Sequence, residues 1–279
     1  DAGWNFSTVW HMLSDLTYPY LRNVPQTDTP DVLGLSEAGA VAAIEAAGFV
    51  AQVTYEYSET LAPDQVVSQS PPAGHTVNAG TPVRITVIRE VIFLSTVEEL
   101  QLLGNDPAYP LEGHYALAQD IDASGTAGWN GGAGFVPIGS TGQILPQSGY
   151  TGTFDGKGHA ISNLTINRPA EDYIGLFNTI GPGGIVKNLG IKGGTSAGRV
   201  VSGCLAAYNS GSLFDCYATG QVSADEGYAG GLVGYSTGTL SRCHATGDVT
   251  GAVAVGGLIG YVTSGTVSES YATGAVTGG

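Results

Sequence analysis

Short alternations of apolar and polar residues dominate the chain from about residue 91 to residue 279. The apolar and polar positions alternate over runs of four to six residues, and Gly, Asn, Ser and Thr separate the runs. Successive side chains of a β-strand point to opposite faces, so this alternation is typical of strands. No helix-forming stretch separates the runs. The pattern therefore predicts many short strands joined by tight turns.

The same region contains an internal repeat with a spacing of 27 residues. Three blocks are in register: Cys216-Tyr-Ala-Thr-Gly-Gln-Val222, Cys243-His-Ala-Thr-Gly-Asp-Val249 and Ser270-Tyr-Ala-Thr-Gly-Ala-Val276. Upstream of each lies a second block: Gly203-Cys-Leu-Ala-Ala-Tyr208, Gly230-Gly-Leu-Val-Gly-Tyr235 and Gly256-Gly-Leu-Ile-Gly-Tyr261. A unit this short cannot bury its apolar face alone, so the units must stack. We predict a mostly β protein whose main part is a parallel β-solenoid.

Stacking places equivalent residues of successive coils in columns. Alternation points Cys243, Ala245 and Val249 inward. The outward positions predict two exterior ladders, one of Tyr217, His244 and Tyr271, the other of Asp215, Arg242 and Glu269. Opposite charges on neighbouring strands, about 4.8 Å apart, are favourable by at most about 1 kcal/mol. These exterior positions are the candidate site residues of the repeat.

The three cysteines follow from the same alternation. Cys216 and Cys243 fall one rung apart in one interior column. A spacing of about 4.8 Å is within the Cα range of disulfides, but side chains in parallel register meet disulfide geometry poorly. Stacked thiols are the favoured interpretation and a disulfide is the alternative. Cys204 alternates outward, where it has no evident partner.

Residues 31–90 have a different pattern. Ser36 is a plausible N-cap for a helix that runs through Ala47 and ends at Gly48. Strand-like alternation follows in Val53, Tyr55 and Tyr57, and again in Val83, Ile85 and Val87. The segment predicts a small α+β domain. Residues 23–30, polar and proline-bearing, predict a linker before it.

Residues 1–22 contain too many large apolar groups for a free tail. Trp4, Phe6 and Trp10 need a surface to cover. The chain opens with this apolar segment and stops at Gly278-Gly279 within the repeat. We expect the segment to close a solenoid, either of another copy of the chain or of an adjacent repeat; a fragment of a larger protein is the alternative.

Composition narrows the classes of function. The chain has 44 glycines and a net charge of −15, from 24 acids and 9 bases. So acidic a chain repels nucleic acid, whose binding depends on clustered Lys and Arg. No apolar run reaches the 18 or so residues that span a bilayer, so no membrane insertion is expected. The chain begins at Asp1 without a basic and apolar leader, which favours a mature, secreted segment.

The sequence gives only weak signals for a catalytic or metal-binding site. Carbohydrate-cleaving β-helices need clustered carboxylates, whereas the acids here are scattered and Asp215 and Glu269 flank Arg242. The alternate acids Asp120 and Asp122 lack the rest of a calcium loop. The five histidines have no metal-ligand spacing. We expect no enzyme activity, no metal and no cofactor.

Two resemblances add to this reading. Asp31-Val-Leu-Gly-Leu35, Val67-Ser-Gln-Ser-Pro-Pro-Ala-Gly74 and Val77-Asn-Ala-Gly-Thr-Pro-Val83 resemble a PASTA domain. PASTA domains are extracytoplasmic; some bind peptidoglycan and others act as spacers. The Gly-Gly-Leu-Val-Gly-Tyr and Tyr-Ala-Thr-Gly blocks of residues 91–279 resemble the GLUG motif of bacterial surface proteins. That resemblance implies a right-handed parallel β-helix with an adhesive or structural role.

Together these features predict an extracellular structural or adhesive protein of the bacterial surface, and more specifically one repeat or subunit of a self-assembling filament. Its partners would be other copies or adjacent repeats. The alternatives are a module that binds peptidoglycan or surface glycan and, less favoured, a carbohydrate-active enzyme.

Overall fold

The computed structural model describes residues 10–11, 20–21, 25–139 and 149–279, and of the first two pairs only the backbone. The chain divides into two compact units, Asp1–Val91 and Ile92–Gly279. A separate hydrophobic core lies in each unit. At its start the first unit has a short antiparallel pair, β1 (Trp10–His11) and β2 (Tyr20–Leu21).

The helix of the first unit forms where the capping signals predict it. The helix α1 (Glu37–Ala46) begins after Ser36, whose hydroxyl accepts a hydrogen bond from the Gly39 N–H at 3.2 Å. It ends before Gly48, which has a positive φ of 81° that favours glycine. The predicted N-cap and C-terminal glycine of this helix are confirmed.

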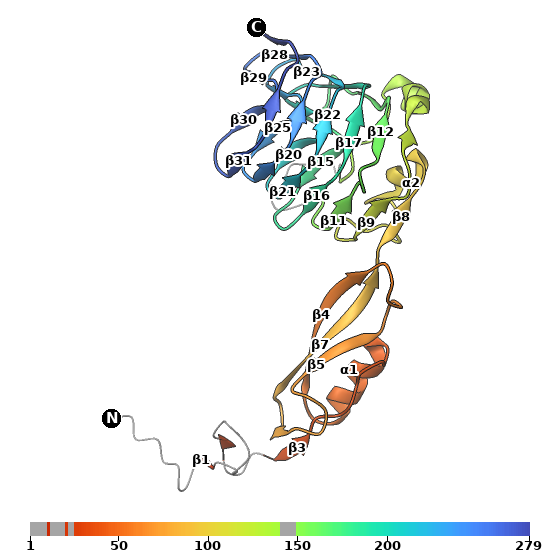
Figure 1. Cartoon of the computed structure of the whole chain (residues 1–279), viewed down its shortest axis with the longest axis vertical. Helices are drawn as coiled ribbons and strands as arrows, with labels where there is room; N and C mark the ends of the chain where they lie inside the picture. The colour runs from red at the N-terminus through yellow and green to blue at the C-terminus, as the bar shows by residue number, and fades with distance from the viewer. Residues whose placement is uncertain (1–9, 12–19, 22–24, 140–148) are drawn as a thin grey trace, which may run out of the picture. The chain divides into compact units, whose positions relative to one another are not determined.

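A three-stranded sheet completes the first unit. Its central strand β7 (Pro82–Glu90) is parallel to β4 (Val50–Ser58) and antiparallel to β5 (Val66–Ser70). The helix α1 lies against one face of the sheet (Figure 1). Ile44 of α1 is fully buried with Val83 and Ile85 of β7. The strand-like alternation of this segment therefore identified the core face of its central strand.

The prediction that residues 23–30 form a linker is wrong for the residues of this segment that the structure describes. Its residues Gln26–Asp28 form strand β3, which pairs antiparallel with β6 (Thr76–Asn78). Thr29 is buried and donates a hydrogen bond to the carbonyl of His75 at 3.2 Å. A polar segment can thus belong to a domain through backbone pairing, which its composition does not reveal.

The second unit is a parallel β-solenoid, as predicted. In the part of this unit that the structure describes, the strands form five sheets built from strands of successive coils, and every pairing between its named strands is parallel. Sheet I contains β8 (Ile92–Leu94), β9 (Tyr115–Leu117), β11 (Thr153–Asp155), β16 (Ile185–Lys187), β21 (Ser212–Phe214), β26 (Thr239–Ser241) and β31 (Thr266–Ser268). Sheet II contains β10 (Ile121–Asp122), β12 (Ala160–Ser162), β17 (Gly190–Lys192), β22 (Tyr217–Ala218), β27 (His244–Ala245) and β32 (Tyr271–Ala272).

The other three sheets complete each coil. Sheet III contains β13 (Thr165–Asn167), β18 (Thr195–Gly198), β23 (Gln221–Ala224), β28 (Val249–Gly251) and β33 (Val276–Gly278). Sheet IV contains β14 (Tyr173–Ile174), β19 (Val201–Gly203), β24 (Tyr228–Gly230) and β29 (Ala254–Gly256). Sheet V contains β15 (Phe177–Ile180), β20 (Ala206–Asn209), β25 (Val233–Ser236) and β30 (Ile259–Val262). Figure 1 shows neighbouring strands of one sheet side by side, coil after coil.

The register of the sheets follows the repeat. Leu213 pairs with Leu240, Ala218 with Ala245, and Val222 with Val249, and all six side chains are buried. Like residues therefore stack in interior columns, which excludes water from the interior of the solenoid. The predicted inward positions Cys243, Ala245 and Val249 are confirmed, since each is at most 1% exposed.

Two helical segments near the start of the solenoid were not predicted. The helix α2 (Val97–Leu102) begins after its N-cap Thr96, and Thr96 and Glu99 form a reciprocal capping box. The segment η1 (Ser124–Gly132) is a 3-10 helix interrupted at Trp129, Asn130 and Gly131. In the described parts of the chain, no helix is long and apolar enough to cross a membrane.

Candidate functional site

The aromatic ladder on sheet II has the predicted register. Tyr217 pairs with His244, and His244 with Tyr271. The ring centroids of Tyr217 and His244 lie 5.2 Å apart, and those of His244 and Tyr271 5.0 Å apart, with interplanar angles of 7° and 4°. In the preceding coil the equivalent residue is Gly190, where a Cβ would come within 2.3 Å of the Tyr217 ring. Both faces of Tyr217 and His244 are thus covered, so these rings offer no platform for a stacking ligand.

The charged column is formed by residues with left-handed backbone conformations. Asp215, Arg242 and Glu269 have φ values of 53°, 54° and 49°, and Asn188 occupies the equivalent turn one coil earlier with φ 53°. Arg242 donates two hydrogen bonds to the Asp215 carboxylate, from Nε and Nη2, both at 2.7 Å. The hydrogen bond from Arg242 lowers the pKa of Asp215. The pKa of Arg242 is raised, chiefly by the hydrogen bond to Asp215 and to a smaller extent by the negative charge of Glu269. This pair of hydrogen bonds links one coil to the next at the surface of the solenoid.

Of the two interior thiols, Cys216 is not disposed for nucleophilic chemistry, whereas its hydrogen bond lowers the pKa of Cys243. Cys216 and Cys243 are free, buried and adjacent in neighbouring coils, where the His244 N–H donates to the Cys216 carbonyl at 3.0 Å. Burial raises the pKa of Cys216 well above that of an ordinary thiol. A thiol that stays protonated is a poor nucleophile.

The predicted outward position of Cys204 is wrong. Cys204 is also a free thiol and is only 2% exposed, and burial raises its pKa to about 12. The chain bends tightly between β19 and β20, and Cys204 and Leu205 are both buried there. A Cβ on Gly203 would lie 2.4 Å from the Ala206 carbonyl oxygen. Strict alternation fails because this bend brings two strands of one coil into close contact.

A second aromatic column was not predicted, although its residues end the Gly-Gly-Leu blocks. Tyr208, Tyr235 and Tyr261 pair in register along sheet V, and we call them, with Tyr228 of sheet IV, the tyrosine stripe. Ring centroids lie 5.1 Å apart for Tyr208 and Tyr235 and for Tyr228 and Tyr261. The Tyr235 and Thr263 hydroxyls are 3.0 Å apart. The stripe therefore contacts itself, which indicates a role in holding coils together.

The side chains of the three predicted assembly residues are not described by the structure. Trp4 and Phe6 lie outside the described residues. For Trp10 the structure describes only the backbone, which pairs with Leu21 in β1 and β2.

The acids considered for calcium accept hydrogen bonds from the chain itself. Asp120 accepts hydrogen bonds from the Ala160 N–H at 2.9 Å, and its carboxylate lies 3.2 Å from His159 Nδ1. Asp122 accepts from the Ser124 N–H at 3.0 Å and from Asn163 at 3.2 Å. Within the described ranges, no three His, Cys, Asp or Glu side chains gather as a metal-binding group. Asp120 therefore links its segment to the one that contains Ala160, and Asp122 contacts both its own turn and Asn163.

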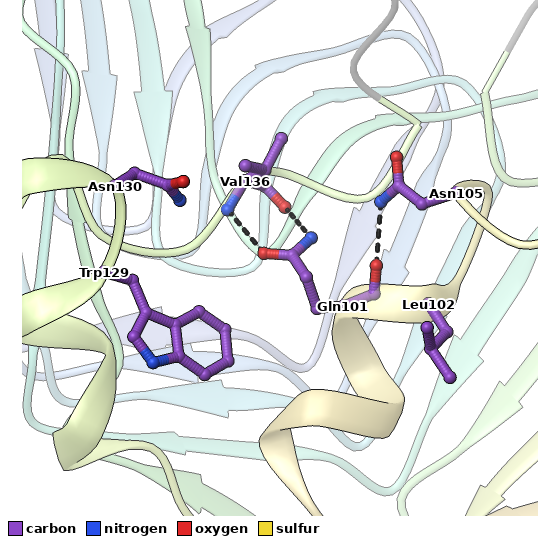
Figure 2. A pocket seen from close by; sticks show the side chains of 6 residues that line it. All are labelled: Gln101, Leu102, Asn105, Trp129, Asn130 and Val136. Carbon is purple, nitrogen blue, oxygen red and sulfur yellow. Dashed lines mark hydrogen bonds between the residues drawn. The ribbon is translucent and has the colours of Figure 1, made fainter.

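Among the described residues, two hollows on the solenoid exterior stand out. One, of about 430 Å³, follows sheet III and is lined by polar residues that include Thr195, Gln221, Ser223 and Asp248. The Asp248 carboxylate accepts a hydrogen bond from the Ala275 N–H of the next coil at 3.1 Å. The other, of about 480 Å³, lies between α2 and η1 and is shown in Figure 2. We call this second hollow the Trp129 pocket.

The Trp129 pocket joins residues far apart in the sequence. Figure 2 shows Trp129 and Asn130 on one side and Gln101 and Leu102 on the other. No repeat passes through these residues, and the sequence pattern did not identify them. The capping box at Thr96 and Glu99 was the one local signal that could have located α2.

Comparisons with known families agree with the motifs. Residues 27–88 match the PASTA domain, and residues 225–250 and 251–277 each match the GLUG motif. The chain therefore carries a PASTA domain followed by GLUG motifs, in the order that the sequence predicted.

Similar proteins include halomucin of Haloquadratum walsbyi, which is 35% identical over 153 residues, covering 54% of this chain and 2% of halomucin. A protein of Evansella cellulosilytica described as a Gly-rich membrane protein is 38% identical over 98 residues, or 35% of this chain and 11% of that protein. The chain thus spans only a small part of either relative. Among solved structures, one described as an immunoglobulin A1 protease of Bacteroides ovatus aligns with a TM-score of 0.45 and 19% identity, covering 67% of each chain.

Proposed function

We propose that this chain is part of a structural or adhesive protein of the cell exterior. The observation that carries the proposal is the coil-by-coil register of the solenoid. Interior columns are apolar, and the exterior columns on sheets II and V stack on themselves or pair between coils. Such a design makes a stiff, extendable scaffold, because each added coil repeats the same contacts. The similarity to a mucin-named protein and to one described as a membrane protein supports an exterior location.

The location is tested with antibodies raised against the 279-residue chain. Intact cells of the source organism are labelled and compared with permeabilised cells. We expect full labelling of intact cells, and loss of the signal after brief protease treatment of the cell surface. Labelling only after permeabilisation would contradict the proposal.

Self-association is the finer form of the proposal. In sheets I to III, strands of the last two coils pair as the earlier ones do, for example Leu240 with Val267 and Val249 with Val276. Further coils, from another copy or an adjacent repeat, would add through the same backbone bonds. Negative-stain microscopy and intact-mass analysis of native material test this. Fibres with a repeat near 28.4 kDa are expected; monodisperse particles would contradict it.

Peptidoglycan binding by the PASTA domain is the second candidate, favoured by the match over residues 27–88. Co-sedimentation of the whole chain with purified peptidoglycan tests it, with residues 92–279 alone as the control. Sedimentation of both to the same extent would argue against a PASTA-mediated interaction.

The proposal includes the absence of enzyme activity. It is supported by the engagement of Asp120, Asp122 and Asp215 in hydrogen bonds to backbone or to Arg242. Incubation with cell-wall and surface polysaccharides, followed by a reducing-sugar assay, tests this part. Sugar release above that of heat-denatured chain would contradict it.

A further inference from the structure

The Trp129 pocket has walls that are fixed by the chain itself. The Gln101 side chain binds the Val136 backbone at both ends: its Oε1 accepts from the N–H at 2.9 Å, and its Nε2 donates to the carbonyl at 3.0 Å (Figure 2). The Asn130 amide donates to the Gly134 carbonyl at 2.7 Å, and the Asn105 amide donates to the Gln101 carbonyl at 2.8 Å. A site held in this way needs little ordering when a ligand binds.

The indole of Trp129 is held differently from the rings of the exterior ladders. Its centroid lies 6.4 Å from that of Phe135 at an interplanar angle of 24°, and Phe135 is fully buried. The core therefore anchors the indole, while Trp129 itself remains partly exposed and lines the pocket. Asn130 and Gly131 follow with positive φ values of 52° and 67°, which turn the chain away and leave the ring at the wall. Here an aromatic surface is available to a ligand.

Amide groups surround this surface, and none of the six lining residues carries a charge. Asn105 and Asn130 are exposed, and their bonds to backbone carbonyls use one N–H each. A side-chain amide has two N–H donors and an acceptor oxygen, so each retains groups for a ligand. The pocket thus combines an apolar wall with neutral donors and acceptors at its edge.

This combination matches the chemistry of a sugar ring. A pyranose presents a face of C–H groups, which packs on an indole, and a rim of hydroxyls that both donate and accept hydrogen bonds. An apolar side chain of a protein partner would instead desolvate the two amides without pairing them, which is costly. A volume of about 480 Å³ lies within the usual range of small-ligand sites. An anionic ligand would find no counter-charge among the lining residues.

We propose that the Trp129 pocket binds a neutral glycan, with a pyranose ring on the indole of Trp129 and its hydroxyls on the amides of Asn130 and Asn105. The inference goes beyond the proposed exterior role and does not depend on the assembly of the solenoid. A failure of this inference can be told apart from a failure of the proposed function, because cell labelling reports the location of the protein whatever the pocket binds.

The test is a titration of the whole ¹⁵N-labelled chain with four neutral probes: cellopentaose, maltopentaose, mannopentaose and chitopentaose. The readout is the indole N–H resonance of Trp129, assigned with the Trp129→Phe variant. At least one probe is expected to shift this resonance saturably at millimolar or lower concentration. Trp129→Ala should weaken binding of that probe, followed by calorimetry, by about tenfold or more, and Trp129→Phe should weaken it less.

Matched variants separate binding from folding. Asn130→Gly tolerates the positive φ while removing the amide, and Asn105→Ala removes the second amide; each should weaken binding about tenfold, or about 1.4 kcal/mol. Tyr271→Ala removes an exposed ring of the sheet II ladder and should leave binding unchanged. Thermal unfolding checks each variant, and the two asparagine variants decide the test if Trp129→Ala does not fold. The proposal is overturned if none of the four probes shifts the resonance, or if the folded pocket variants bind as tightly as the parent chain.

Discussion

At the scale of single residues, His114 is a histidine whose pKa is linked to folding. It is half-buried in the turn before β9, and burial, together with the charge of Lys187, lowers its pKa from 6.5 to about 4. The unfolded chain therefore takes up a proton at higher pH than the folded chain does. The contribution of His114 to the free energy of unfolding is therefore fully present above pH 6.5, and it is lost as the pH falls from there towards 4.

We predict that His114→Gln reduces this loss. Between pH 7.5 and pH 4.5 the parent chain should lose about 1 kcal/mol more unfolding free energy than the variant, after allowance for the partial exposure of His114. The pKa values of Asp215 and Asp155 are lowered from that of an ordinary aspartate, so these two carboxyls are not the source of the difference. Denaturant unfolding at the two pH values measures the difference, and equal losses in both chains would disprove the linkage.

The buried thiols give a second prediction at this scale. Because burial raises the pKa of Cys204 to about 12, and also raises that of Cys216, neither thiolate is populated at neutral pH. A thiol-specific aromatic disulfide reagent at pH 8 should label Cys204 and Cys216 of the folded chain at least a hundredfold more slowly than the same residues of the chain unfolded in guanidinium, which is the control. Rapid labelling of Cys204 in the folded chain, located by peptide mass mapping, would show that its site is open.

At the scale of elements, the glycine of the repeated Ala-Thr-Gly blocks is required by the distance between coils. A Cβ on Gly247 would lie 1.8 Å from the Gly220 carbonyl oxygen, and one on Gly274 would lie 2.0 Å from that of Gly247. The atoms approached are backbone, so a larger residue can be accommodated only by separating the strands. The motif is thus a packing requirement of sheets II and III.

We predict that Gly247→Ala destabilises the solenoid by at least about 2 kcal/mol, at the upper part of the usual range for overpacking. Gly125→Ala is the matched control, because nothing lies within 4 Å of a Cβ at that position. It should change the unfolding free energy by less than about 1 kcal/mol. Chemical unfolding followed by circular dichroism compares the two, and similar effects would argue against the close approach.

At the scale of the whole molecule, the chain has two cores. One contains Ile44, Val83 and Ile85 of the first unit, and the other runs through the solenoid from Leu94 to Val249. Each unit thus buries enough apolar surface to be a folding unit by itself.

We therefore predict that residues 1–91 and 92–279 fold when produced separately. Each fragment should unfold cooperatively, and its calorimetric midpoint should agree within about 5 °C with one of two transitions in the whole chain. A fragment with the dispersion of an unfolded chain in its NMR spectrum, or a single transition for the whole chain, would show that the units depend on each other.

The sequence alone determined the features that are local or periodic. Period-two alternation identified the buried face of β7 and the inward positions Cys243 and Ala245. The 27-residue repeat identified the in-register pairing of Tyr217, His244 and Tyr271. Capping residues located α1. These predictions succeed because the direction of a strand residue, and the register between identical coils, depend on near neighbours in sequence and on repetition.

The tertiary structure decided what depends on contacts between distant segments. Gln26–Asp28 became a strand because Thr76–Asn78 pairs with it, and Cys204 turned inward because one coil bends tightly on itself. The Trp129 pocket exists because Gln101 binds the backbone of Val136, 35 residues further along the chain. No periodic signal marks these positions, since each is produced by a single long-range contact whose geometry arises only when the chain has packed.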